Sequence, residues 1–113
     1  MREALIQRIL DQKIIAIVRG VYGEDCVKLA QALHDGGIEM MEVTFEQGKP
    51  EALAQTADTI RLLAGRLGGQ MVFGAGTVTS TDMLELAERA GAQFAVSPDV
   101  NEAVIRQTVA DGL

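Results

Sequence analysis

One carboxylate set among apolar residues is the clearest sign of chemistry in this sequence. Glu42 lies within residues 40–45 and is flanked by Met41 and Val43. A buried carboxylate is costly unless it is paired or protonated, and desolvation raises its pKa. A raised pKa suits general acid–base work near neutral pH. The alternative is an edge-strand glutamate that faces water, but the continuous apolar run favours the functional interpretation.

Other residues that could serve a site also follow apolar runs. Arg19 comes directly after residues 14–18, where a guanidinium could bind a carboxylate through two hydrogen bonds or remain a solvated loop charge. Residues 74–77, Gly-Ala-Gly-Thr, could let an anion approach the backbone near a helix start, although a tight turn is the favoured alternative. Ser97 and Pro98 end a fourth run, and we interpret this turn as structural, with apolar contact to a small substrate.

These residues must be positioned by elements that alternate along the chain. Continuous apolar runs predict buried strands, and apolar residues spaced by three and four predict helices. The expected strands are residues 14–18, 38–44, 71–74 and 94–96. The expected helices are residues 1–12, 24–34, 50–67, 81–90 and 101–110. Such alternation predicts an α/β fold with a parallel sheet and right-handed crossovers.

The strand ends distinguish two parallel architectures. An open doubly wound sheet would carry a Gly-rich turn after its first strand, but residues 19–23 lack the G-x-G-x-x-G spacing. Polar residues, in one case followed by a proline, instead end every strand, which is typical of barrel enzymes. They are Arg19, Glu42 with Thr44, Thr77, and Ser97 with Pro98. We therefore predict an α/β half-barrel, four βα units of a TIM (β/α)₈ barrel with a short N-terminal helix, as a single domain over residues 1–113.

Composition and charge narrow the classes of function. The 113 residues are 48% hydrophobic and carry a formal net charge of −6. This balance argues against nucleic acid, whose phosphates require clustered Lys and Arg, and no apolar stretch approaches the length of a membrane span. The single histidine, His34, and scattered acidic residues predict no metal site. The single cysteine, Cys26, fits a reducing compartment, so we expect a cytoplasmic protein without a cofactor.

Four motifs in order resemble the 2-keto-3-deoxy-6-phosphogluconate (KDPG) aldolase family, which includes 4-hydroxy-2-oxoglutarate aldolase. They are IIAIVRG at 14–20, GGIEMMEVTF at 36–45, GAGTV at 74–78 and GAQFAVSP at 91–98. The resemblance covers nearly all of the chain. It implies a class I aldolase of the Entner–Doudoroff type, which cleaves KDPG or a related 2-keto acid to pyruvate and an aldehyde through a Schiff base. The full-length family also implies a homo-oligomer, a trimer.

The resemblance assigns roles to individual residues. It implies that Glu42 is the general acid–base, that Arg19, Thr44 and Thr77 contact substrate, and that Pro98 borders the pyruvate. One residue departs from the pattern, because many relatives carry an arginine where this chain has Glu46. A carboxylate cannot repeat that anion contact, so we expect the substrate to differ from the phosphogluconate compound.

A larger departure concerns the Schiff-base lysine, which the family carries on a sixth strand. This chain has only Lys13, before the first strand, Lys28, on a helix, and Lys49, in a loop. We therefore expect a truncated N-terminal half that is inactive alone and, with its two outer strands unpaired, is marginal, aggregated or self-associated. Two alternatives stay open: a non-catalytic half-barrel assembly module, and another phosphate-binding TIM-barrel enzyme.

Overall fold

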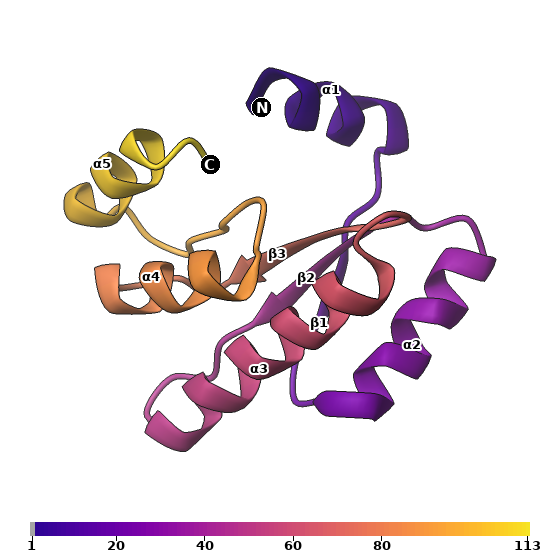
Figure 1. The fold of residues 1–113 in the computed structure, drawn as a ribbon. Helices are drawn as coiled ribbons and strands as arrows, with labels where there is room; N and C mark the ends of the chain where they lie inside the picture. Colours follow the sequence, from indigo (N-terminus) through magenta and orange to yellow (C-terminus); the bar gives the residue numbers. More distant parts are fainter. Residues whose placement is uncertain (1) are drawn as a thin grey trace.

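The computed structural model describes residues 2–113 and contains a three-stranded parallel sheet with five helices. The strands are β1 (Ala16–Val18), β2 (Met40–Thr44) and β3 (Val72–Gly76), and their spatial order is β1-β2-β3. The helices are α1 (Arg2–Gln12), α2 (Gly23–Asp35), α3 (Pro50–Leu67), α4 (Thr81–Ala90) and α5 (Glu102–Ala110). Figure 1 shows α2 and α3 on one side of the sheet and α1 on the other. The α/β half-barrel expected from the sequence is confirmed.

Capping residues, a proline and a glycine explain where several of the helices begin and end. Ser80 and Asn101 accept hydrogen bonds from the backbone N–H groups of Met83 and Val104, and so cap the N-termini of α4 and α5. Pro50 opens α3, where its missing N–H costs nothing. Gly91 ends α4 with a φ of 102°. These boundaries agree with the expected helices to within a residue or two.

The two faces of the sheet have different coverings. Met41, Val43 and Phe45 are fully buried and belong to the main core beneath the helices. The neighbouring positions of β2 face the other way, because successive strand residues alternate sides. On that inner face Met40 packs with Val72 and Phe94, and α1 contributes apolar contacts there. The helix α1 therefore covers the inner face at the end where the strands begin.

The segment expected to form a fourth strand makes only one bridge, between Ala75 and Ala95. Its backbone still runs along β3, because the Ala75 N–H donates to Phe94 at 3.0 Å and the Val96 N–H donates to Ala75 at 2.9 Å. Gly91 precedes this segment in a left-handed conformation and the Ser97–Pro98 turn follows it. Only a few residues between these turns are extended, which explains why a full strand does not form.

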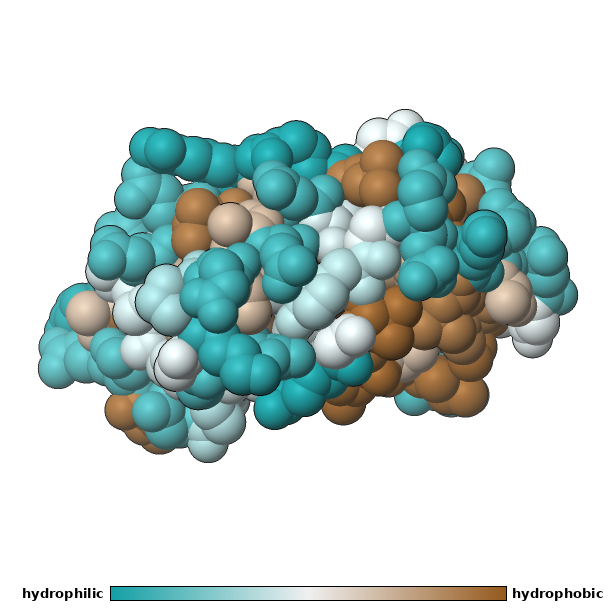
Figure 2. Space-filling model, turned by 90° about the horizontal axis from the view of Figure 1, so that it is seen from below, coloured by the Kyte–Doolittle hydropathy of each residue, from teal (hydrophilic) through white to brown (hydrophobic). Residues whose placement is uncertain are grey.

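Large apolar side chains are exposed at both sides of the sheet. Ile14 and Ile17, at the β1 edge, are 57% and 69% exposed, and Val100, before α5, is 89% exposed. The view from below Figure 1 shows a mainly hydrophilic surface with a brown apolar area toward one side (Figure 2). Within residues 2–113, none of the helices combines the length and apolar character needed to cross a membrane.

A close contact between β3 and the segment after α4 predicts the effect of one substitution. A Cβ added at Gly74 would overlap the ring of Phe94, which is only 7% exposed. We expect Gly74→Ala to lower the free energy of unfolding by roughly 1–3 kcal/mol, the usual cost of overpacking. Urea unfolding measures this change. The control is Gly65→Ala in α3, whose Cβ would meet open space and which should raise stability by roughly 0.5–1 kcal/mol.

The surroundings of the Glu88 carboxyl group in α4 lead to a second prediction, the effect of Glu88→Gln on stability. Burial and the neighbouring charges of Asp111 and Glu85 raise its pKa above the ordinary value. A carboxyl whose pKa is raised by folding destabilises the folded state when it ionises. Glu88→Gln is therefore expected to raise the melting temperature near neutral pH, with the gain disappearing below pH 4.5. Thermal unfolding across this pH range tests it, and a gain that persists in acid would contradict it.

Candidate functional site

Most of the chemistry-bearing residues lie at the end of the sheet where the strands finish. Ile17 pairs with Glu42, which pairs with Gly74, and Thr44 pairs with Gly76. Because side chains alternate along strands, Glu42 and Thr44 share the inner face, opposite the helix-covered core. Arg19 follows β1 and Thr77 follows β3 at the same end.

The Glu42 side chain is buried on this inner face. Only 6% of the residue is exposed, and the Thr44 hydroxyl donates a hydrogen bond to Glu42 Oε1 at 3.3 Å. The carboxylate lies over Gly76, where an added Cβ would overlap Oε1, Cδ and Cγ of Glu42. The absence of a side chain at Gly76 therefore provides the space that Glu42 occupies.

Burial also sets the proton affinity of this carboxyl. Desolvation raises the pKa of Glu42 above its ordinary value, while the Thr44 hydrogen bond and the positive charge of Arg19 oppose that rise. The net shift is upward, so the group holds its proton at higher pH than an exposed glutamate does. A carboxyl with a raised pKa is better suited than an exposed glutamate to accept a proton and then donate it again.

Arg19 and Thr77 meet across the end of the sheet. Arg19 Nη2 donates a hydrogen bond to Thr77 Oγ1 at 3.2 Å, although the two residues are 58 positions apart in sequence. The Arg19 side chain is exposed, and Thr77 has a φ of 55°, in the left-handed region. A guanidinium and a hydroxyl placed together can bind one carboxylate group. The structure thus brings Arg19, Thr77, Thr44 and Glu42 to one end of the sheet.

Pro98 is at the same end of the sheet, but its turn is held there by a hydrogen bond of its neighbour. Ser97, its neighbour, donates a hydrogen bond from its hydroxyl to the Val78 carbonyl at 2.7 Å. This bond holds the Ser97–Pro98 turn beside the loop that follows β3. Pro98 itself is exposed. Its place at the rim, the edge of the sheet where the strands finish, suits a residue that borders a small molecule. Within the described residues, no hydrogen bond joins Pro98 to Glu42.

Two residues that support this site were not predicted from the sequence. Gly76 was interpreted as part of a backbone approach for a ligand, whereas the structure shows that it accommodates Glu42. Gln47 lies in the loop after β2 and contacts the loop after β3 through Thr77 and Thr79. No periodicity or charge pattern marks a loop glutamine, because its partners are distant in sequence. The spacing of Gly74 and Gly76, both on the face of Glu42, was the one available signal.

The rim also holds the residue that departs from the family pattern. Glu46 forms an ion pair with Lys49, with 3.5 Å between its Oε2 and the lysine Nζ. Burial and the Glu46 carboxylate raise the pKa of the neighbouring Tyr22 hydroxyl. Lys13, Lys28 and Lys49 are all exposed. None of these three lysines lies in the buried, apolar surroundings of an activated amine nucleophile.

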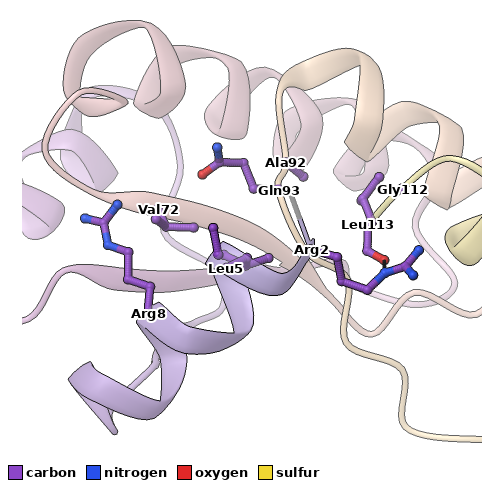
Figure 3. A pocket seen from close by; sticks show the side chains of 9 residues that line it. Arg2, Leu5, Arg8, Val72, Ala92, Gln93, Gly112 and Leu113 are labelled. Carbon is purple, nitrogen blue, oxygen red and sulfur yellow. Dashed lines mark hydrogen bonds between the residues drawn. The ribbon is translucent and has the colours of Figure 1, made fainter.

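A cavity of about 340 Å³ lies at the opposite end of the sheet, where the strands begin. Arg2, Leu5 and Arg8 of α1 line it, together with Val72 at the start of β3 (Figure 3). The two guanidinium groups are already engaged, Arg2 with the Leu113 carbonyl and Arg8 with Glu39. This cavity is separate from the Glu42 end of the sheet. The residues at the Glu42 end have the geometry better suited to chemistry.

Known proteins are similar to this chain in sequence and in fold. A 2-dehydro-3-deoxy-phosphogluconate aldolase of Treponema pallidum is 37% identical over 101 residues, covering 89% of this chain and 45% of the relative. The solved KDPG aldolase of Zymomonas mobilis ZM4 with 3-phosphoglycerate has a TM-score of 0.78 at 28% identity, covering 98% of this chain and 49% of that one.

A third protein carries a bound reaction intermediate. The KDPG aldolase of Legionella pneumophila was solved with pyruvate captured as a covalent carbinolamine; its TM-score is 0.64 at 33% identity, covering 78% of this chain and 39% of that one. The chain spans about half the length of the curated relatives it matches. The family model described as "Aldolase: KDPG and KHG aldolase" matches residues 5–112. With nearly every residue inside that match and the half-barrel in place, the chain belongs to the KDPG and KHG aldolase family, whose members are carbon–carbon lyases.

Proposed function

We propose that this chain supplies the acid–base half of an aldolase site that cleaves a 2-keto acid, KDPG or a related compound, to pyruvate and an aldehyde. The observation that carries the proposal is the buried Glu42 carboxyl, whose raised pKa suits proton transfer, at the same end of the sheet as Arg19 and Thr77. Relatives over most of this chain are aldolases for such compounds.

The chemistry requires one group that moves a proton twice. In a class I cleavage the keto carbon of the substrate is held as an iminium ion. Glu42 accepts the proton of the C4 hydroxyl, the C3–C4 bond breaks to release the aldehyde, and the bonding pair moves into an enamine. Glu42 then returns its proton to C3, and hydrolysis of the resulting imine releases pyruvate. A carboxyl whose pKa is raised toward the working pH can act in both directions.

The neighbouring residues would hold the substrate and the catalytic carboxyl. Arg19 and Thr77, joined at 3.2 Å, offer a cation and a hydroxyl to the substrate carboxylate. Thr44 fixes Glu42 through its hydrogen bond and contacts the substrate at the end of β2. Pro98 provides an apolar border for the pyruvate methyl group. Glu46, paired with Lys49, cannot repeat the anion contact of an arginine at this position, which favours a substrate unlike the phosphogluconate compound.

The imine nitrogen must come from outside this chain. Lys13, Lys28 and Lys49 are exposed, and the amine of a Schiff-base enzyme must be unprotonated to attack. We propose that residues 1–113 form one structural unit, the N-terminal half of an aldolase barrel, which is inactive until a second half provides the lysine. The full-length assembly would be a cytoplasmic homo-oligomer, a trimer.

Reconstitution with a second half tests this proposal. We define the reconstituted pair as this chain co-expressed with the C-terminal half of the Treponema pallidum relative. Incubation with pyruvate and borohydride should leave a reduced pyruvate adduct on a lysine of the C-terminal half, detected by mass spectrometry. This chain alone should give no adduct. A soluble, folded pair that gives none would count heavily against the aldolase proposal.

A second function, as a half-barrel assembly module, is favoured by the exposed apolar residues at both sides of the sheet. Ile17 in β1 and Val100 before α5 are the most exposed of these. Surfaces of this kind promote association between chains. Size-exclusion chromatography with light scattering should show the isolated chain to be self-associated. A stable monomer with dispersed amide resonances would contradict the assembly function and leave the aldolase proposal intact.

A further inference from the structure

Three successive carbonyl groups in the loop after β3 each accept a hydrogen bond from a different side chain. The Thr77 carbonyl accepts from Gln47 Nε2 at 3.2 Å, the Val78 carbonyl from Ser97 Oγ at 2.7 Å, and the Thr79 carbonyl from Asn101 Nδ2 at 3.2 Å. These donors come from the loop after β2 and from the turn before α5. The loop of residues 77–79 is therefore fixed from two sides by side chains.

The loop needs this support because Thr77 is in an unfavourable conformation. Its φ of 55° lies in the left-handed region, where a β-branched residue is an outlier. Such a conformation persists only when its surroundings enforce it, and it often marks a functional site. In this conformation the Thr77 hydroxyl accepts a hydrogen bond from Arg19 Nη2. The left-handed backbone is thus tied to the contact that would bind substrate.

Gln47 is the side chain that contacts this loop at both ends. Its Nε2 donates to the Thr77 carbonyl, and its Oε1 accepts from the Thr79 hydroxyl at 3.1 Å. One amide group therefore spans the loop from the residue in the strained conformation to the residue two positions later. Gln47 also lies three residues after Thr44, so it links the strand that carries Glu42 to the loop that carries Thr77.

We propose that Gln47 is a positioning residue, whose amide holds Thr77 in the left-handed conformation so that the Thr77 hydroxyl and the Arg19 guanidinium form a preassembled site for the carboxylate of a 2-keto acid. This inference rests on the proposed aldolase function. Preassembly favours binding, because the loop is already ordered before the ligand arrives. Gln47 acts through Thr77 and does not touch the reacting atoms.

Substitution of Gln47 in the reconstituted pair tests the inference. Gln47→Leu keeps a similar side-chain size but removes the hydrogen bonds to Thr77 and Thr79, and the long contact of Nε2 with Met83 Sδ. It should raise the pyruvate concentration that gives half-maximal borohydride trapping about tenfold, with the maximal adduct unchanged. Gln47→Glu keeps the acceptor but replaces the donor to the Thr77 carbonyl, and should give a similar rise. The matched control is Gln31→Leu in α2, whose amide donates to Asp35 on its own helix, and it should change neither value.

The same substitution in a Thr77→Asn variant distinguishes a positioning role of Gln47 from general destabilisation of the protein. Asparagine tolerates the left-handed region better than threonine does. In a Thr77→Asn variant, therefore, Gln47→Leu should raise the half-maximal pyruvate concentration less than threefold beyond the effect of Thr77→Asn alone. An equal rise in both backgrounds, or no rise in either, would overturn the inference.

The inference and the proposed function can fail separately. If the wild-type pair gives no adduct, the aldolase function fails, and the ¹³C chemical shifts of Thr77 then test the conformational claim. In Gln47→Leu these Cα and Cβ shifts should move away from left-handed values, whereas Gln31→Leu should leave them unchanged. If the Thr77 chemical shifts in Gln47→Leu remain typical of a left-handed backbone, the positioning role is refuted, whatever the adduct experiment shows.

Discussion

Glu42→Gln in the reconstituted pair should lower the rate of aldol cleavage by roughly 10²–10⁴-fold, the range that general acid–base catalysis contributes. The same substitution should raise thermal stability near neutral pH. Glutamine keeps the shape of the side chain and can still accept from the Thr44 hydroxyl, but it carries no charge into the buried site. Loss of activity together with a gain in stability is the expected signature of a carboxyl that is buried for its chemistry.

The pH dependence of this gain has a definite sign. Folding raises the pKa of Glu42 above its ordinary value of 4.5, because desolvation outweighs the Thr44 hydrogen bond and the Arg19 charge. Below pH 4.5 the carboxyl is protonated in both the folded and unfolded states, so wild type and variant should melt at similar temperatures. As pH rises through the raised pKa, ionisation destabilises the wild type, and the difference reaches its maximum.

An exposed glutamate provides the control for this experiment. Glu51→Gln removes an exposed carboxylate from the first turn of α3, where negative charge stabilises a helix. It should lower the melting temperature slightly at neutral pH, the opposite sign to Glu42→Gln. Thermal unfolding from pH 4 to pH 8 measures both variants. A Glu42→Gln variant that melts below the wild type at neutral pH, or that cleaves substrate at the wild-type rate, would refute the assigned role.

Much of the architecture could be predicted from the sequence, because apolar periodicity and capping residues are local signals. The run around Glu42 is continuous because β2 is buried on both faces, and the structure confirms all five of its residues as buried. Ser80 and Asn101 cap α4 and α5, within a residue of the helix starts expected from the sequence. Cys26 packs in the core, and its burial raises the pKa of the thiol to about 11, which leaves it protonated.

The features that the sequence could not predict depend on contacts between distant segments. The segment around Ala95 forms a single bridge because the turns on either side of it leave few extended residues. The left-handed Thr77 and the bonds that Gln47 makes to its loop require the register of β2 against β3. The sequence placed Arg19 and Thr77 only at strand ends, and their 3.2 Å contact emerged from the fold.

Gly76→Ala should abolish aldol cleavage nearly as fully as Glu42→Gln, but with the opposite effect on stability. The new Cβ would overlap Oε1, Cδ and Cγ of Glu42, so the carboxyl must leave its position on the inner face. Displacement into a buried, closely packed region should lower the free energy of unfolding by roughly 1–3 kcal/mol. Urea unfolding, and the rate at which the reconstituted pair releases pyruvate from KDPG, measure the two effects.

The control for Gly76→Ala is Gly69→Ala, where an added Cβ meets open space, and it should change neither activity nor stability appreciably. A double variant then identifies the cause of the damage. If the overlap with Glu42 is responsible, Gly76→Ala should cost little stability in a Glu42→Ala background, where the clashing atoms are absent. Equal destabilisation in both backgrounds would mean that Gly76 serves the backbone of β3 instead. Because the two residues lie on adjacent strands and share one small volume, their effects should be strongly non-additive.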